Sequence, residues 1–312
     1  MGNYQSKLMS KNGKVIMQLS RELITCNIGE RIKTVEEYAN IFRTGRGTVQ
    51  GGLKFLEEEE ALKLESRGRL GTYIVKIDYE KLWSISNFGT IMGVMPLPYS
   101  KRYEGLATGL YKAFEKAKIP FSLAFMRGAS KRLEALKLGK YDFVVTSKLA
   151  VNVEMSYFSN IEIAYEFGPK SYVGQHVVIF REKNVTQIED GMRIGIDTSS
   201  PDQYLLTKYE CEGKKVEYIE TSYNQIIKKI ESGEINAAIW NEDEIKEKGL
   251  NLNICSLKNV KTINISNMDT IAALVVNKNN DDFKNVVSKF INMNIIKHIQ
   301  NEVLDGKLIP SY

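Results

Sequence analysis

The stretch from Ile32 to Ile74 reads IKTVEEYANIFRTGRGTVQGGLKFLEEEEALKLESRGRLGTYI, and it decides how the rest of the chain is interpreted. Apolar residues recur in it at helical spacing twice, first at Val35, Tyr38, Ala39 and Phe42 and then at Val49, Leu53 and Leu56. Thr34, with Glu37 three residues later, forms a capping box that begins the first helix, and Thr44–Gly45 separates the two helices. The pattern predicts a helix-turn-helix.

A basic loop follows these helices. Leu62, Leu64, Tyr73 and Val75 frame the segment 66–71, whose glycines permit a turn and whose arginines project outward. An amphipathic segment upstream, from Val15 to Ile24, supplies a third helix, so we expect a winged helix-turn-helix that places one helix in the major groove of double-stranded DNA. The residue types that reach bases and phosphates are predicted to bind DNA at Thr34, Arg43, Arg46, Thr48, Gln50, Lys54, Arg67 and Arg69.

The alternative is an ordinary helical hairpin with a solvated charged face. Two features limit the DNA interpretation. Gly51 and Gly52 each cost about 1 kcal/mol in a helix relative to Ala, so a neighbour must pack closely there. The glutamates at 57–60 repel phosphate, so they must face away from DNA.

On these residues the segment resembles the DNA-binding domain of the GntR superfamily. The positions that match its pattern are Arg46, Thr48, Val49, Leu53, Leu56, Gly71 and Thr72. Gly45, Gln50 and Gly52 depart from it, which affects the base preference more than the fold. The resemblance covers about the first quarter of the chain and implies DNA binding.

The composition is that of a globular protein with two or three domains. The 312 residues are 43% hydrophobic and 26% charged, with a net charge of +5, which is compatible with nucleic acid but does not require it. The three cysteines have no metal spacing and there are only two histidines, so we expect a reduced cytoplasmic protein without a metal or other cofactor. No apolar run approaches the ~20 residues that span a bilayer, and no secretory leader opens the sequence.

After Ile77 the order strand-helix-strand-helix-strand occurs twice. The first set has strands at 90–95, 121–125 and 141–146 with helices at 103–118 and 130–137. The second has strands at 193–197, 216–219 and 236–240 with helices at 202–209 and 223–231. Apolar strands at 176–180 and 270–276 lie where the chain crosses between the two sets. This order predicts two α/β lobes with mostly parallel sheets.

The expected fold class is therefore α/β overall. It comprises a winged helix-turn-helix at 1–80 and a two-lobed domain at 81–312, with lobe 1 at about 88–180 plus 270–312 and lobe 2 at about 181–269. The two lobes resemble a type 2 periplasmic-binding-protein domain, as do LysR-type effector domains. The combination resembles the YhfZ family of bacterial regulators over nearly the whole chain. A flavodoxin-like domain or two unrelated α/β units are the alternatives.

Ligands of such sheets lie outside the carboxyl ends of the strands, so the loops there face each other across a cleft. Those loops predict ligand-binding residues at Pro96, Tyr99, Arg127, Ser130, Thr146, Ser147, Thr198, Ser199, Ser200, Ser222, Tyr223 and Trp240. Hydroxyl residues at helix N-termini and the Arg127 guanidinium favour a small anionic ligand, with the aromatic rings against its body. Taken singly, each hydroxyl residue is better explained as a helix cap, and it is the convergence of six loops that favours a ligand site.

The leading functional hypothesis is a homodimeric transcriptional regulator that binds an operator and a small-molecule effector. An enzyme and a solute-binding protein are the alternatives. The sequence shows no nucleophile–base pair, no phosphate-binding glycine loop and no metal cluster, so we expect no catalytic residues.

Overall fold

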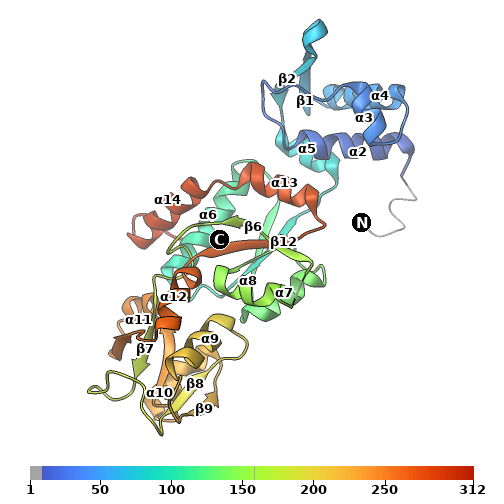
Figure 1. Ribbon diagram of the computed structural model, residues 1–312. Helices are drawn as coiled ribbons and strands as arrows, with labels where there is room; N and C mark the ends of the chain where they lie inside the picture. The colour runs from blue at the N-terminus through green and yellow to red at the C-terminus, as the bar shows by residue number, and fades with distance from the viewer. Residues whose placement is uncertain (1–8, 158) are drawn as a thin grey trace. The chain divides into compact units, whose positions relative to one another are not determined.

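The computed structural model describes residues 9–157 and 159–312, and the chain divides into two compact units (Figure 1). The first comprises the residues up to Ile91 together with Phe114–Phe121, and the second comprises Met92–Ala113 and Ser122–Tyr312.

The first unit is a helix-turn-helix followed by a β-hairpin. Its elements are α2 (Lys11–Leu23), α3 (Val35–Ile41), α4 (Arg46–Glu58), β1 (Leu62–Ser66), the 3-10 turn η1 (Gly68–Leu70), β2 (Thr72–Ile77) and α5 (Tyr79–Ser86). β1 and β2 pair antiparallel and form the wing. α5 packs on α2 and buries Leu82 and Trp83, so this helix, which the sequence-based boundary at 80 divides, belongs to the first unit.

The local signals that predicted the helices are present as expected. The Thr34 hydroxyl accepts a hydrogen bond from the Glu37 amide at 3.2 Å, and the Glu37 carboxylate accepts one from the Thr34 amide at 2.6 Å. A Cβ placed on Gly52 would lie 2.8 Å from the Leu19 side chain of α2, whereas one on Gly51 would meet nothing within 4 Å. The close packing predicted for the glycine pair therefore holds for Gly52 alone.

The second unit contains two five-stranded sheets, one in each lobe. The first has the order β4-β3-β5-β12-β6 and the second the order β11-β7-β10-β8-β9. The strands of the first are β3 (Ile91–Met95), β4 (Phe121–Phe125), β5 (Phe143–Ser147), β6 (Ile161–Glu166) and β12 (Ala272–Asn277). Those of the second are β7 (His176–Phe180), β8 (Arg193–Ile196), β9 (Glu217–Glu220), β10 (Ala237–Asn241) and β11 (Asn253–Ser256).

Helices cover the faces of both sheets (Figure 1). Those associated with the first lobe are α6 (Lys101–Glu115), α7 (Ala129–Lys137), α8 (Lys148–Met155), α13 (Asp281–Phe290) and α14 (Met293–Leu304). Those that follow strands of the second sheet are α9 (Pro201–Glu210), the 3-10 turn η2 (Tyr223–Gln225), α10 (Ile226–Ser232), α11 (Glu242–Glu247) and α12 (Val260–Asp269). The predicted repeat of strands and helices is confirmed.

The sheets are mixed, whereas the sequence predicted mostly parallel ones. β3 with β5, β8 with β9 and β8 with β10 are parallel, but β12 is antiparallel to β5 and β6, and β7 is antiparallel to β10 and β11. The cause is the crossing of the chain. A strand that arrives from the other lobe starts at the cleft edge, where its parallel neighbours end, as the pairing of Ala272 with Ser147 shows.

The first crossing lies earlier than the sequence-based boundary at 180. β7 pairs with β10 and β11 in the second sheet, so His176–Phe180 belongs to the second lobe and the chain crosses between Glu166 and His176. The return crossing lies at 270–271, between α12 and β12. The two crossings connect lobes whose strand ends face the same cleft.

Candidate functional site

The exposed face of α4 carries three of the eight residues predicted to bind DNA. Arg46, Gln50 and Lys54 are exposed, while Val49 and Leu53 on the opposite side are buried. The Arg46 guanidinium forms an ion pair with Glu36 of α3, and Lys54 lies 3.4 Å from Glu58 one turn further on. Exposed ion pairs of this kind contribute little to stability. Arg46 and Lys54 can therefore leave their carboxylate partners and pair with phosphates.

The other predicted residues of this unit occupy the turns around α4. Thr34 is engaged as the N-cap of α3, Thr48 is half-buried in the first turn of α4, and Arg43 lies in the connecting turn with a φ of 51°. A left-handed backbone costs a non-glycine residue roughly 1–2 kcal/mol. A glycine would fit this turn better, so the arginine at 43 is better explained by its side chain than by its backbone.

The wing presents two arginines at its end. Arg67 lies over the Tyr73 ring, 4.5 Å from its centroid, and bonds the Glu65 carboxylate at 2.9 Å, while Arg69 is exposed. Between them and the second strand, Leu70 is 65% exposed. The sequence analysis missed this apolar tip, because a single leucine between arginines and glycines carries no periodicity.

The glutamates at 57–60 are drawn into contacts at the end of α4. Glu57 accepts a hydrogen bond from the Leu64 amide at 2.9 Å, and Glu60 lies 3.6 Å from the Lys81 ammonium. The acidic run follows the exposed polar stretch of α4 and is anchored toward the hairpin and α5.

A cavity of about 60 Å³ lies between the two lobes of the second unit. Of the twelve residues predicted for this site, five line the cavity, namely Pro96, Tyr99, Arg127, Ser200 and Tyr223. The lobes approach closely at its rim, where a Cβ on Gly128 would lie 3.2 Å from the Ser199 carbonyl oxygen of the other lobe.

The remaining seven predicted residues do not line the cavity. The Ser130 hydroxyl bonds Glu154, and Thr198 donates to Glu220 at 2.9 Å. Ser222 flanks η2, and Ser199 donates to Asp197 at 2.6 Å. The other three, Thr146, Ser147 and Trp240, are buried.

Arg132 is the most informative side chain of the cavity, and the sequence analysis missed it. It belongs to α7, is only 2% exposed, and lines the cavity. Its guanidinium donates to the Met126 carbonyl at 2.8 Å, and to the Thr146 and Tyr172 hydroxyls at 3.3 and 3.2 Å. Its Nε is buried without a hydrogen-bond partner in the part of the chain that the structure describes. A buried unpaired donor costs about 1–3 kcal/mol.

Asp202 faces the same cavity from the second lobe. Its carboxylate accepts a hydrogen bond from the Ser147 hydroxyl of the first lobe at 2.7 Å. Burial raises the pKa of Asp202 from 3.8 to about 6, against the lowering effect of the Ser147 hydroxyl. This hydrogen bond therefore joins the lobes through a group that titrates close to neutral pH.

His176 and Asp269 form a buried pair beside the two crossings. The His176 Nδ1 lies 2.7 Å from an Asp269 carboxylate oxygen. Burial alone lowers the pKa of His176, but the Asp269 carboxylate, together with those of Asp202 and Asp243, outweighs it and the pKa is raised. The pair fixes the start of β7 against the end of α12.

Asp197 organises the loop after β8. One of its oxygens accepts from the Ser199 amide at 2.9 Å and the other from the Tyr223 amide at 2.8 Å. Its own amide donates to the Gln203 side chain at 2.7 Å. Both carboxylate oxygens are used by the protein, so Asp197 holds the loop in shape.

Aromatic rings form one wall of the cleft. Tyr223 stacks on the buried Trp240 with centroids 3.7 Å apart, and Tyr99 of the first lobe lies 5.6 Å from the Tyr223 ring. An ion pair ties the lobes outside the cavity, where Arg102 bonds Asp243 at 2.8 and 3.2 Å. The cleft thus combines an aromatic wall with a buried guanidinium.

Residues 9–157 and 159–312 hold no group of three or more His, Cys, Asp or Glu side chains placed to bind a metal ion. Within the same ranges, no helix is both long and apolar enough to span a bilayer.

Comparison with known proteins agrees with this architecture. The sequence model of the YhfZ C-terminal domain matches residues 78–312, and that of a helix-turn-helix domain matches residues 27–74. YhfZ of Escherichia coli (strain K12) is 38% identical over 245 residues, which cover 78% of this chain and 79% of that protein. The crystal structure of YhfZ from Shigella flexneri, 33% identical, covers 75% of this chain and 97% of that one with a TM-score of 0.61.

A more distant structure shows the fold of the second unit. The periplasmic aliphatic sulphonate binding protein SsuA from Escherichia coli is 14% identical and superposes with a TM-score of 0.51 over 70% of this chain and 74% of its own. The two-lobed unit is therefore periplasmic-binding-protein-like. Because the C-terminal domain model alone spans more than half of the residues, the chain belongs to the YhfZ family.

Proposed function

We propose that this protein is a transcriptional regulator that binds double-stranded DNA through its first unit and a small anionic effector in the cleft of its second unit. As such it acts in the cytoplasm, as a homodimer, and does not turn its effector over. The observation that carries the effector proposal is the buried Arg132 guanidinium.

The DNA proposal rests on the exposed face of α4 and the basic wing. Arg46, Gln50 and Lys54 offer donors suited to base edges and phosphates, and Arg67 and Arg69 extend from the adjacent hairpin. In winged helix-turn-helix proteins the second helix of the motif enters the major groove. Of the acidic residues at the end of α4, Glu57 and Glu60 are held toward the hairpin and α5, whereas Glu58 lies beside Lys54.

The effector proposal rests on unsatisfied donor capacity between the lobes. The Arg132 Nε has no partner among the described residues, and the half-buried Arg127 guanidinium, on the same rim, makes no hydrogen bond there either. An anionic group is the ligand that satisfies both, since charge-assisted bonds to guanidinium are about twice as strong as neutral ones. Tyr99 and Tyr223 lie where the body of such a ligand would pack.

The sulphonate-binding protein with the same fold gives the anion proposal a chemical parallel. The identity of that protein's ligand is not transferred here, because the two chains are only 14% identical. The parallel is the reason to test sulfonates together with carboxylates and phosphates.

DNA binding is tested by selecting duplexes from a randomised pool with the full chain. We expect an enriched sequence whose binding weakens steeply with salt, and loss of that preference in Arg46→Ala. Enrichment of an inverted repeat would support the dimer, which sedimentation measures directly. A pool that shows no enrichment contradicts the proposed function.

Effector binding is tested by thermal shift against a panel of small carboxylates, phosphates and sulfonates. A ligand at 100 times its Kd stabilises the unit by about 2.7 kcal/mol, which is readily detected. Arg127→Gln should weaken the response about tenfold or more, because it removes a charge-assisted bond worth roughly 1.5–3 kcal/mol. Arg181→Gln, an exposed arginine of the second lobe, is the control. Chemical conversion of the stabilising compound would favour an enzyme.

A further inference from the structure

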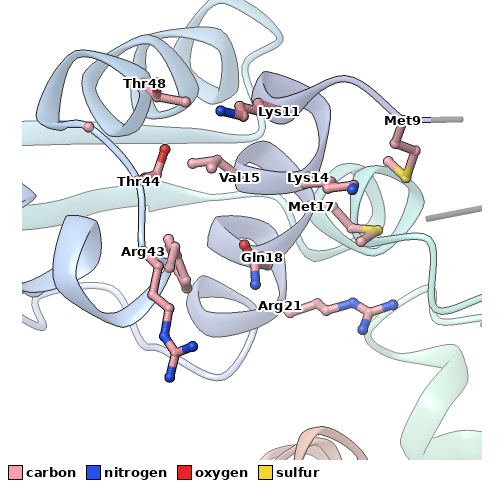
Figure 2. A pocket seen from close by; sticks show the side chains of 12 residues that line it. Met9, Lys11, Lys14, Val15, Met17, Gln18, Arg21, Arg43, Thr44 and Thr48 are labelled. Atoms are coloured by element: carbon pink, nitrogen blue, oxygen red, sulfur yellow. The ribbon is translucent and has the colours of Figure 1, made fainter. Parts of the chain in front are cut away.

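A second depression, of about 690 Å³, lies in the first unit between α2 and the turn that joins α3 to α4 (Figure 2). Its apolar part includes Val15 and Met17, which are both buried. Its polar lining consists of Lys11, Lys14, Gln18, Arg43, Thr44 and Thr48, together with Arg21, which is already bonded to the Ser86 carbonyl. No acidic side chain is among the described residues that line it.

Three of these basic side chains are uncompensated. Lys11, Lys14 and Arg43 form no ion pair and no side-chain hydrogen bond within residues 9–157 and 159–312. Lys11 and Lys14 also lie in the first turn of α2, which contains no acidic residue. The helix dipole disfavours cations at that end by roughly 0.3–1 kcal/mol each. Their position therefore costs stability, and an anion on this surface would offset that cost.

The basic groups are distributed along the depression. In Figure 2 the Lys11 side chain points toward Thr44 and Thr48, that of Lys14 toward the opposite side, and that of Arg43 downward, away from both. A single small anion would require these groups to converge on one point. A chain of phosphates, with one charge per strand about every 3.4 Å along the duplex axis, matches a distributed set.

The depression is continuous with the start of α4. Gly45, the N-cap of α4, and Thr48 in its first turn both line it, so a strand seated there would pass directly beside the end of the helix that enters the major groove. We propose that this depression seats one DNA backbone strand, and that Lys11 and Lys14 of α2 bind its phosphates. This inference rests on the proposed DNA-binding function and adds a second contact surface to it.

The test compares the full chain with its Lys11→Gln/Lys14→Gln double variant on a mixed-sequence duplex and on the selected duplex, by fluorescence anisotropy over a range of salt. Each lost phosphate contact reduces the slope of log K against log salt by about 0.9, so the slope should fall by about 1.8. A slope difference of about 1.8 corresponds to a factor of ~60 in relative affinity for each tenfold change in salt concentration. At ~0.1 M salt the variant should therefore bind up to ~60-fold more weakly than the unaltered chain. The loss should be the same on both duplexes, because phosphate contacts carry no sequence information.

Two controls separate this loss from a folding defect or a change in bulk charge. Lys140→Gln/Lys183→Gln removes two exposed lysines of the second unit, and should leave the slope unchanged. A Lys11→Glu/Lys14→Glu variant should bind still more weakly while its first unit melts no lower, because acidic residues suit a helix N-terminus.

The alternatives give different results. An unchanged slope and affinity in the Lys11→Gln/Lys14→Gln variant would overturn the inference while leaving the proposed function in place. If tripolyphosphate binding is lost in that variant but duplex binding is not, the depression holds a small polyanion, and the DNA assignment is wrong. If the unaltered chain binds no duplex at all, the proposed function itself fails and this inference fails with it.

Discussion

Replacing Asp202 with asparagine should stabilise the two-lobed unit at neutral pH. Its pKa of about 6 in the folded state, against 3.8 as the ordinary value, means that ionising it costs folding about 2 pKa units, or ~3 kcal/mol at 1.36 kcal/mol per unit. That cost is absent below about pH 4, where the carboxyl is protonated in both states, and is complete above about pH 6–7. Stability therefore falls as the pH rises through this window.

The substitution preserves shape and removes charge. Asparagine still offers an oxygen to the Ser147 hydroxyl, so the hydrogen bond between the lobes is kept. The pKa of about 6 already includes the effect of that hydrogen bond, so the gain for Asp202→Asn should be about 3 kcal/mol at about pH 8 and near zero at about pH 4. For a unit of this size that corresponds to a rise in Tm of roughly 6–12 °C at the higher pH.

The assay uses Trp240, which lies in the second lobe beside the cleft. A Trp83→Phe background leaves it as the only indole, since the chain has two tryptophans. Melting followed by its fluorescence at several pH values should show curves that coincide at low pH and diverge as the pH rises. A Tm lowered by the same amount at every pH would refute the reasoning, because it would mean that Asp202 acts through packing and not through its charge.

His176 adds to the same pH dependence in the parent protein. The Asp269 carboxylate raises its pKa, so its stabilising contribution is complete below its ordinary value of 6.5 and is lost as the pH rises through the raised one. Asp202→Asn should therefore flatten the pH dependence without abolishing it.

Substitutions at four further positions test the capping and packing described above. Thr34→Ala should lower the stability of the first unit by about 1 kcal/mol, whereas Thr34→Ser should retain the cap, as a thermal melt would show. Gly52→Ala should destabilise that unit because its methyl group meets an α2 side chain, while Gly51→Ala, in open space, should stabilise it by about 1 kcal/mol; equal effects of the two would contradict the packing. Gly128→Ala should cost at least ~1–2 kcal/mol for its positive φ alone, and its Cβ should also hold the lobes apart at Ser199, lowering the Tm of the second unit.

The parts of the fold that were predicted correctly depend on residues that lie close together in the sequence. The capping box at Thr34, the turn at Gly45 and the two series of alternating strands and helices depend on residues within a few positions of one another. The lobe to which β7 belongs depends instead on pairing across the second sheet with β10. A fully buried apolar strand such as His176–Phe180 has the same residue pattern whichever sheet it joins. The sequence therefore does not indicate which strands it pairs with.

The residues that line the cavity likewise divide into those that local sequence predicts and those that only the tertiary fold reveals. Pro96, Tyr99 and Tyr223 were found because they follow strands, where α/β sheets bind ligands. Arg132 was not found, because an arginine within a helix is usually solvated and only the tertiary fold buries it. One of its hydrogen-bond partners is the hydroxyl of Tyr172, forty positions further along the chain.

The contacts between the lobes are of a kind that a ligand can shift. Ser147 to Asp202 and Arg102 to Asp243 are polar contacts whose formation requires desolvating a carboxylate, and that penalty largely offsets the attraction. Under the proposed function, contacts of this type would let open and closed arrangements of the lobes lie close in free energy. A ligand that binds the closed form ~10⁴-fold more tightly moves such an equilibrium from 1:99 to 99:1. The unpaired Arg132 Nε supplies one source of that preference, since only a bound acceptor satisfies it. Under the proposed function, the cost of leaving that donor unpaired would make closure of the lobes depend on the anionic effector.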